Sequence, residues 1–206
     1  MIIFDMDGTL WNTTNITLES ANLVALKYDD VKPFTVDIIE NGMGLSFKEN
    51  VRNYFPYLDK DTGSKYLNEI ISNTIKLINE KDAYIYDGVI DTIKKLSKNY
   101  KLAIVTNNNT DYVELFLNKS GLNDYFVDYL GAATYNISKS DAIKVIINRN
   151  NEENCFYVGD TKRDKDASKE AKCTFIHARY GFDKSLESKY HIDSINEIEE
   201  IIKKIK

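Results

Sequence analysis

Apolar and polar positions alternate in blocks along most of the chain. Short apolar runs, rich in β-branched and aromatic residues, occupy residues 2–4, 102–105, 125–130, 155–158 and 173–176. Each run ends in a polar residue or a glycine. Runs of this kind, without strict alternation, are typical of strands that are covered on both faces. We therefore predict five strands of a buried sheet.

Amphipathic helix patterns separate several of these runs. Apolar residues recur at helical spacing within 87–98, 110–120 and 138–149, and again in the last segment, 195–205. Strands that alternate with helices in this way predict a parallel sheet with right-handed crossovers and helices on both sides. The predicted fold class is α/β, with a doubly wound, Rossmann-like parallel sheet as its core.

Residues 14–82 depart from this alternation. They carry helical patterns and no convincing strand, with apolar helix faces around 18–26, 47–55 and 67–78. Because this stretch follows the first strand and precedes the remaining ones, it interrupts the sheet rather than extending it. We predict an all-helical domain over 14–82, inserted into an α/β core that comprises 1–13 and 83–206.

Composition excludes two classes of partner. The chain has 206 residues, with 27 lysines and arginines against 32 aspartates and glutamates, which gives a formal charge of −5. This mild acidity argues against a nucleic-acid surface, and no apolar run approaches the ~20 residues of a membrane helix. Neither a nucleic acid nor a membrane is expected as a partner. We expect a monomer, with a weak dimer as the alternative.

The cysteines and the first residues bear on cellular location. The start of the chain lacks the basic segment and the long apolar segment of a secretory signal. Cys155 and Cys173 both lie in apolar runs, and we expect buried free thiols in a reducing compartment rather than a disulfide framework. The expected location is therefore cytoplasmic.

Polar side chains gather where the predicted strands end. In an open parallel sheet, ligands bind at the carboxyl ends of the strands, near a switch in strand order. The residues at these ends are Asp5, Asp7, Thr106, Asn107 and Asp160, with Asp164 just beyond the fourth run and Lys139 at the start of a helix after the third. We expect these side chains to converge on one crevice.

This set of side chains suits phosphate chemistry. Carboxylates that lie close together cannot all stay ionised without a cation, because like charges raise one another's pKa. Oxygen ligands with no cysteine or histidine cluster favour a hard ion such as Mg²⁺, which leaves coordination room for a phosphate oxygen. Lys139 can balance the remaining phosphate charge, and Thr106 can donate a hydrogen bond to it. Of Asp5 and Asp7, one can attack phosphorus to form an aspartyl phosphate and the other can serve as general acid and base.

The motifs occur in an order that resembles a known family. DMDGT at 5–9 resembles the first motif of haloacid dehalogenase-like (HAD) phosphohydrolases, VTN at 105–107 the second, Lys139 the third and VGDTKRD at 158–164 the fourth. The helical insert matches the position of the helical (C1-type) cap of this family. The chain is most similar to its phosphoglycolate-phosphatase-like group, and the resemblance covers essentially the whole length.

The resemblance implies an activity and two catalytic residues. It implies a phosphoric monoester hydrolase that acts on a small phosphorylated metabolite, either phosphoglycolate-like or a sugar or nucleotide monophosphate, through an aspartyl phosphate. Asp5 would be the nucleophile and a Mg²⁺ ligand. Asp7 would be the general acid and base, with its backbone carbonyl on the metal.

The resemblance also assigns the other motif residues. Asp160 would bind Mg²⁺ directly, and Asp164 would bind it or hold its water ligands. Thr106, Asn107 and Lys139 would bind the transferring phosphoryl group.

Three positions qualify these assignments. Ser140 follows the proposed lysine where relatives usually have proline, which makes Lys144 the fallback, and Asn12 stands where many relatives have aspartate. Thr9 stands where the mutase branch usually has valine, which favours hydrolysis over the alternative of a phosphomutase of the β-phosphoglucomutase type. A second alternative is a receiver-like, phospho-accepting signalling domain. Its phosphorylated aspartate would end the third strand, where this chain has Leu130 and Gly131.

Overall fold

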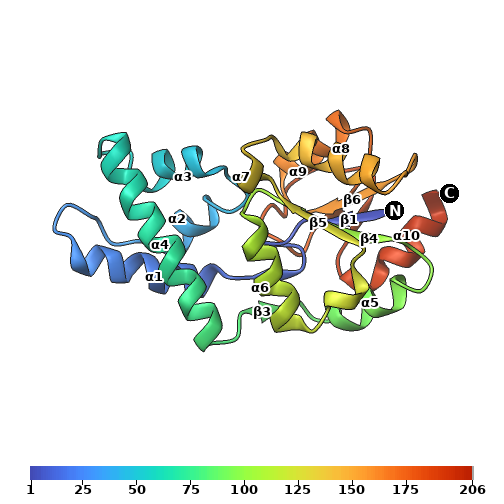
Figure 1. Ribbon diagram of the computed structural model, residues 1–206, viewed down its shortest axis with the longest axis horizontal. Coiled ribbons are helices and arrows are strands. Elements are labelled where there is room, and N and C mark those ends of the chain that lie inside the picture. Colours follow the sequence, from blue (N-terminus) through green and yellow to red (C-terminus); the bar gives the residue numbers. More distant parts are fainter. Residues whose placement is uncertain (206) are drawn as a thin grey trace. The chain divides into compact units, whose positions relative to one another are not determined.

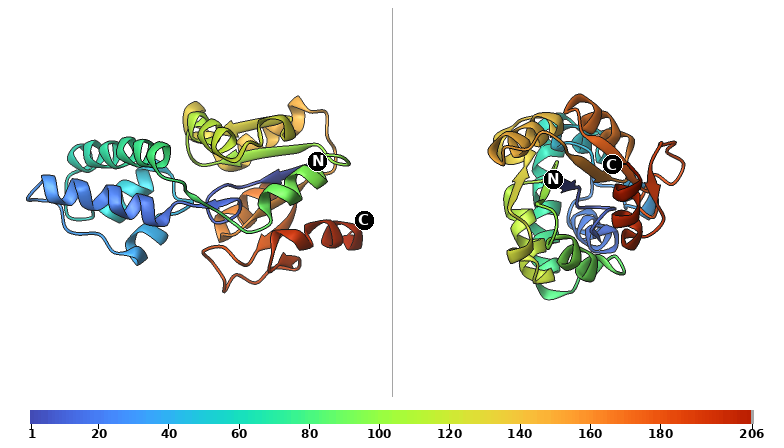
Figure 2. Two further views of the ribbon diagram at one scale, coloured as in Figure 1. Left: turned by 90° about the horizontal axis from the view of Figure 1, so that it is seen from below. Right: turned by 90° about the vertical axis from the view of Figure 1, so that its right-hand side faces the viewer.

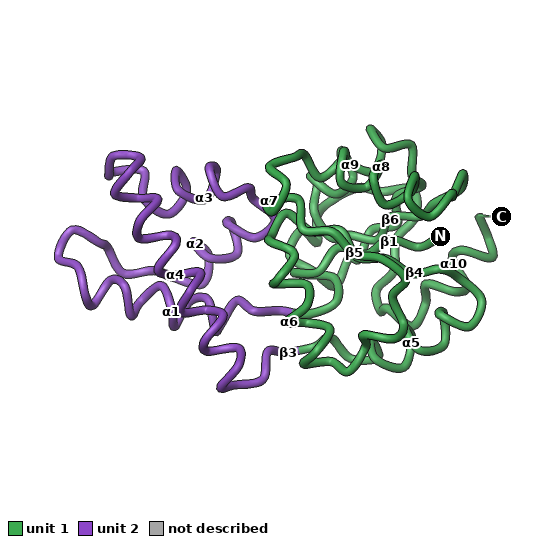
Figure 3. The backbone as a smooth tube through the Cα atoms, in the orientation of Figure 1, with its two compact units in different colours: residues 1–11, 85–206 green, residues 12–84 purple. Residues whose placement is uncertain are grey.

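The computed structural model describes residues 1–205. By its internal packing the chain divides into two compact units (Figure 3). Unit 1 contains residues 1–11 and continues from Ile85 onward, and unit 2 contains residues 12–84.

Unit 1 is built on a sheet of six parallel strands in the order β5-β4-β1-β6-β7-β8. In Figure 2 the dark blue β1 lies between the green β4 and the orange β6. The strands are β1 (Ile2–Phe4), β4 (Leu102–Thr106), β5 (Asp128–Gly131), β6 (Phe156–Gly159), β7 (Thr174–Ala178) and β8 (His191–Ile192). The predicted α/β fold with a doubly wound parallel sheet is confirmed.

Helices cover both faces of this sheet. Figure 1 shows α8 and α9 on one face and α5 and α10 on the other. The helices of unit 1 are α5 (Val89–Leu96), α6 (Thr110–Ser120), α7 (Ala132–Tyr135), α8 (Lys139–Arg149), α9 (Lys162–Glu170) and α10 (Ile198–Ile205). On the first face, Ile3, Ala103 and Tyr157 of the strands pack with Ile143 and Ile146 of α8 in one buried apolar cluster. Burial on both faces explains why the strands appear in the sequence as continuous apolar runs.

The sequence pattern did not predict α9, β8 or the four-residue α7 of unit 1. α9 has the polar sequence KRDKDASKE and buries only Asp164 and Ser168, so it carries no apolar stripe that periodicity could detect. The two-residue β8 at the sheet edge is too short to form an apolar run. The predicted strand over 125–130 begins only at Asp128, because Asn123–Tyr125 form a 3₁₀ turn.

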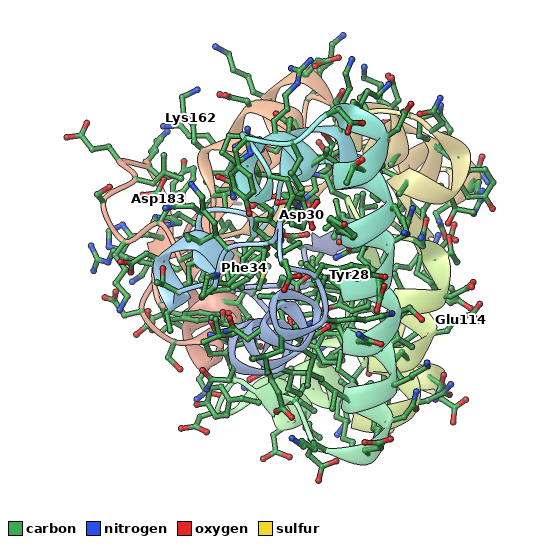
Figure 4. The ribbon with its side chains drawn as sticks, turned by 90° about the vertical axis from the view of Figure 1, so that its left-hand side faces the viewer. Tyr28, Asp30, Phe34, Glu114, Lys162 and Asp183 are labelled. Atoms are coloured by element: carbon green, nitrogen blue, oxygen red, sulfur yellow. A yellow bond between two sulfur atoms is a disulfide. The ribbon has the colours of Figure 1, made fainter. Side chains whose placement is uncertain are left out.

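Unit 2 consists of helices around its own apolar core. They are α1 (Thr14–Lys27), α2 (Val36–Glu40), α3 (Phe47–Tyr54) and α4 (Lys60–Glu80), and the short strands β2 (Trp11–Asn12) and β3 (Tyr84–Ile85) form a separate two-stranded sheet. Tyr28, Asp30 and Phe34 follow α1 (Figure 4). The Tyr66 hydroxyl of α4 donates to Asp30, and the Phe34 ring packs edge-on against Phe55.

The structure corrects the expectation for the two cysteines. Cys155 and Cys173 form a disulfide, with their Cα atoms 5.0 Å apart. They directly precede β6 and β7, whose register pairs Phe156 with Thr174, so they are neighbours across the ladder. The sequence placed each cysteine in a strand but gave no register between those strands. Without free thiols the cysteines no longer indicate a reducing compartment, and the cytoplasmic location stays a prediction.

No helix within residues 1–205 is both long enough and apolar enough to cross a membrane.

Candidate active site

The carboxyl ends of the three central strands lie side by side. β1 lies between β4 and β6, and its last residue, Phe4, is level with Ile104 and Val158. Asp5 follows directly, and its backbone N–H donates to the Val158 carbonyl at 2.8 Å. The strand order changes direction at β1, because β4 and β5 lie on one side and the later strands on the other. A switch point of this kind is where open parallel sheets bind ligands.

Three carboxylates converge at this edge of the sheet. Asp5, Asp160 and Asp164 each place a carboxylate oxygen within 4.8 Å of the others, and all three side chains are buried. Asp160 follows β6, and Asp164 lies in the first turn of α9. The three residues therefore come from separate segments of unit 1 that the sheet brings together.

Lys139 bridges two of these carboxylates. It is the first residue of α8, and its side chain is buried. Its Nζ donates to Asp5 Oδ1 at 2.9 Å and to Asp164 Oδ1 at 2.7 Å. Lys144, the fallback from the sequence, keeps a side-chain exposure of 40% and forms its ion pairs with surface carboxylates. The structure thus places Lys139, and not Lys144, in the cluster.

Local hydrogen bonds hold Asp164 in place. Thr161 caps α9, and its backbone N–H and Oγ1 donate to Asp164 Oδ2 at 3.0 and 2.6 Å. This capping arrangement leaves Asp164 Oδ1 for Lys139. The buried Tyr157 donates its hydroxyl to the Val105 carbonyl at 3.0 Å, and that hydroxyl lies 3.4 Å from Asp164 Oδ1.

Two glycines let the backbone approach Asp160 closely. A Cβ atom on Gly8 or on Gly181 would overlap the Asp160 side chain, and Gly8 also has a φ of +82°, which favours glycine. The Phe182 backbone N–H donates to Asp160 Oδ2 at 2.7 Å. Asp160 Oδ1 is buried and has no hydrogen-bond partner among the described residues. A buried carboxylate oxygen without a donor is the position where a cation is expected.

The electrostatics of the cluster follow from burial and crowding. Burial raises the pKa of Asp5 to about 7; the Asp164 charge adds to this shift, and Lys139 opposes it. Burial, with Asp164 and Asp5 nearby, also raises the pKa of Asp160 well above its usual value. Burial on its own lowers the pKa of Lys139, but the Asp164 and Asp5 carboxylates outweigh it and raise that pKa. Protein groups alone therefore do not compensate the negative charge.

The donor set fits a hard divalent cation. When all three carboxylates are ionised, the single ammonium of Lys139 leaves two negative charges uncompensated. Carboxylate oxygens are the ligands that Mg²⁺ prefers, and Asp160 Oδ1, which has no donor within the described part of the chain, offers one of them.

The other predicted residues lie outside this carboxylate group. The Asp7 carboxylate accepts from Asn108 Nδ2 and from the Tyr112 hydroxyl, each at 3.0 Å. Thr106 is buried at the end of β4, and its Oγ1 accepts from the Asn108 backbone N–H at 3.3 Å. Asn107 is the next residue and is half-buried. The roles of these residues stay predictions.

Sequence reasoning missed three contributors to the site. Asn108 and Tyr112 hold Asp7, and Phe182 donates to Asp160. Asn108 and Tyr112 lie just beyond β4, so a search for donors after each strand end finds them as candidates. Phe182 acts through its backbone N–H, which no side-chain pattern reveals.

Comparisons with known proteins agree with this architecture. The sequence profile of the haloacid dehalogenase-like hydrolases matches residues 2–178. Phosphoglycolate phosphatase of Photobacterium profundum is 28% identical over 196 residues, covering 88% of this chain and 83% of that protein. Pyrophosphatase PpaX of Listeria monocytogenes serotype 4a is 27% identical over 177 residues, covering 83% of this chain and 79% of that protein.

A solved structure shares the fold over nearly the full length. A haloacid dehalogenase-like family hydrolase from Streptococcus pneumoniae superposes with a TM-score of 0.84 at 22% identity, covering 98% of this chain and 97% of that one. The chain belongs to the haloacid dehalogenase-like hydrolase family, and it is a hydrolase of the phosphatase type.

Proposed function

We propose that the protein is a Mg²⁺-dependent phosphatase that hydrolyses a small phosphorylated metabolite through an aspartyl phosphate on Asp5. One observation carries this proposal. The buried Asp5 carboxylate is paired with Lys139 and lies in one group of carboxylates with Asp160, whose Oδ1 has no partner among residues 1–205, at the switch point of the sheet. A nucleophile, a cationic side chain and a candidate metal-ligand oxygen are therefore adjacent.

The reaction proceeds in two steps. In the first, an Asp5 oxygen attacks phosphorus, the bond from phosphorus to the leaving oxygen breaks, and Asp7 gives its proton to that oxygen. In the second, water attacks the phosphorus of the aspartyl phosphate and its proton passes to Asp7. Inorganic phosphate leaves, and Asp5 is a carboxylate again. Lys139 holds the Asp5 side chain in position and favours its ionised form.

Other residues bind the phosphoryl group and the metal. Asp5, Asp160 and Asp164 would hold Mg²⁺ together with the backbone carbonyl of Asp7. When bound, Mg²⁺ supplies positive charge that offsets the charge of the phosphate. Thr106 and Asn107, at the end of β4, would bind phosphate oxygens together with Lys139.

We also propose that unit 2 is a cap that selects the substrate. Its chain enters after β1 and returns before α5, so it is inserted next to the segment that carries Asp5 and Asp7. Exclusion of water during the first step protects the aspartyl phosphate from untimely attack, and a mobile cap provides that exclusion.

A substrate panel tests the activity. Because two relatives are named phosphoglycolate phosphatase and pyrophosphatase, the panel contains phosphoglycolate, inorganic pyrophosphate, a sugar phosphate and a nucleoside monophosphate. We expect phosphate release with added Mg²⁺, no release with EDTA, and recovery when Mg²⁺ is in excess. Release that is insensitive to EDTA removes the metal from the proposal. Transfer of the phosphoryl group to a second sugar position would identify a mutase instead.

Mg²⁺ is expected to stabilise the protein more at about pH 8 than at about pH 5. The folded state holds the Asp5 proton more tightly than the unfolded state, with a pKa of about 7 against 3.8. The metal-free protein therefore loses stability as pH rises from about 4 to about 7, and Mg²⁺ restores it by binding the ionised carboxylates. Thermal unfolding with and without Mg²⁺ at the two pH values measures this difference.

Asp160→Asn is expected to reduce the Mg²⁺-dependent rise in Tm, because it replaces a ligand oxygen. Asp124→Asn, which changes an exposed aspartate of the same unit, is the matched control. Equal Mg²⁺ shifts in the two variants would exclude Asp160 from the metal site.

A further inference from the structure

The Asp7 carboxylate is held by two donors of unit 1 outside the metal-binding group. Asn108 Nδ2 donates to Asp7 Oδ2 and the Tyr112 hydroxyl donates to Asp7 Oδ1, both at 3.0 Å. Asp7 itself has an exposed fraction of 7%. Each carboxylate oxygen thus has a protein donor at hydrogen-bond distance, and the two donors together fix the orientation of the Asp7 side chain.

Packing holds Tyr112 in this position. It lies in the first turn of α6, and the centroid of its ring is 5.1 Å from the centroid of the fully buried Trp11 ring. The Trp11 ring also contacts Phe116, one turn further along the same helix, at 5.2 Å. Trp11 ends the turn that carries Asp7, because its backbone carbonyl accepts from the Gly8 N–H at 2.9 Å. Trp11, whose ring packs against Tyr112, and Asp7, whose carboxylate accepts from the Tyr112 hydroxyl, therefore belong to the same short turn.

The loop that carries Asn108 is fixed in a different way. The Asn108 backbone N–H donates to Thr106 Oγ1 at 3.3 Å, and its carbonyl accepts from the Ala133 N–H at 3.3 Å. A Cβ atom on Gly131 of β5 would overlap the backbone of Asn109 and Thr110. This close approach positions the loop against the end of β5.

We propose that Asn108 and Tyr112 are positioning residues that orient the Asp7 side chain for proton transfer to the leaving oxygen. This inference rests on the proposed function. In the first step the bond between Asp5 and phosphorus forms, the bond to the leaving oxygen breaks, and the proton of Asp7 moves to that oxygen. The two donors hold Asp7, which gives the proton, so they act on proton transfer and not on attack at phosphorus.

A leaving-group comparison separates this role from a general structural one. An alkyl phosphate needs its leaving oxygen protonated, whereas 2,4-dinitrophenyl phosphate releases a stable anion without a proton. The measured quantity is kcat/KM, which reports the steps up to the first irreversible one. In Tyr112→Phe, kcat/KM for the alkyl ester is expected to fall at least about 10-fold further than kcat/KM for 2,4-dinitrophenyl phosphate, since the variant lacks one of these two hydrogen bonds to Asp7.

The controls use the same pair of substrates. Tyr129→Phe removes a hydroxyl that donates to the surface carboxylate of Glu114 at 3.2 Å. Any change in kcat/KM in this variant should be the same for the two esters. Asn108→Ala should show the same leaving-group dependence as Tyr112→Phe, which keeps the test decisive if one of the two variants does not fold.

The outcomes distinguish this inference from the proposed function. If the wild type hydrolyses both esters and the two variants lose activity equally on both, or lose none, the positioning role is overturned while the phosphatase stands. A wild-type protein that is inactive on both esters overturns the proposed function and this inference with it.

Discussion

Asp5→Asn is expected to reduce kcat for phosphate release by about 10⁴-fold or more, because the amide cannot form the acyl phosphate on which both steps depend. The substitution keeps the shape of the side chain and removes only its charge. Rapid quenching of the wild type during turnover should trap an acid-stable, alkali-labile phosphoryl group on the protein. The variant should trap none.

The same substitution is expected to stabilise the metal-free protein at about pH 8. Asp5 is raised in pKa from 3.8 to about 7 by burial first and by the Asp164 charge second. Its ionisation in the folded state therefore costs free energy on the order of 4 kcal/mol, at 1.36 kcal/mol per pH unit, once the pH exceeds about 7. Asparagine does not titrate, so the advantage of the variant should shrink as the pH falls toward 4. Urea unfolding at several pH values without Mg²⁺ measures it.

Loss of activity together with a gain in stability is expected when a residue is needed for function but its charge is buried at a cost in free energy. Asp124→Asn, in the exposed turn Asn123–Tyr125, should leave both activity and stability near the wild-type values. If Asp5→Asn retains more than a small fraction of the wild-type rate, and its mass shows no conversion of the amide back to aspartate, the nucleophile lies elsewhere.

The sequence predicted where chemistry gathers because parallel strands share one carboxyl edge. Asp5 and Asp160 each follow a predicted strand, so an ordered parallel sheet has to bring them close together. Lys139 begins α8 and Asp164 lies in the first turn of α9, and both helices return from that edge. Their convergence follows from topology alone, without knowledge of strand register.

Other features needed information that one sequence does not hold. The disulfide between Cys155 and Cys173 depends on the adjacency of β6 and β7 and on their register. The hydrogen bonds from Asn108 and Tyr112 to Asp7 depend on how the start of α6 folds back toward the turn after β1. Apolar periodicity reports which face of an element is buried, and it does not report which polar groups meet across elements.

Lys139→Met is expected to lower the free energy of unfolding by about 3–5 kcal/mol at about pH 8, because it removes the cation from a buried pair and leaves the carboxylates uncompensated. Lys139 donates to both Asp5 and Asp164. Methionine keeps most of the side-chain length and its apolar contacts, so the loss reports the charge. We also expect kcat/KM to fall by about 10²- to 10³-fold through loss of a donor to the phosphoryl group.

The pH dependence of that destabilisation identifies its cause. Lys139 opposes the upward shift of the Asp5 pKa, so its removal raises that pKa further. The variant is then least stable where the carboxylates must ionise and recovers as the pH falls and they take up protons. Added Mg²⁺ should restore part of the stability at about pH 8 but little of the activity, because the metal replaces the missing charge without replacing the missing donor.

Lys144→Met provides the comparison that makes this result specific. Lys144 lies five residues beyond Lys139 on the same helix, but its ion pairs to Asp141 and Glu170 are exposed. Exposed pairs contribute about 0–1 kcal/mol, so this variant should be nearly as stable and as active as the wild type. If the two methionine variants behave alike, or if the loss in Lys139→Met does not diminish at low pH, then the ammonium of Lys139 does not compensate the carboxylate cluster. If Lys144→Met alone loses activity, the phosphate-binding lysine is Lys144, which the departure at Ser140 had left open.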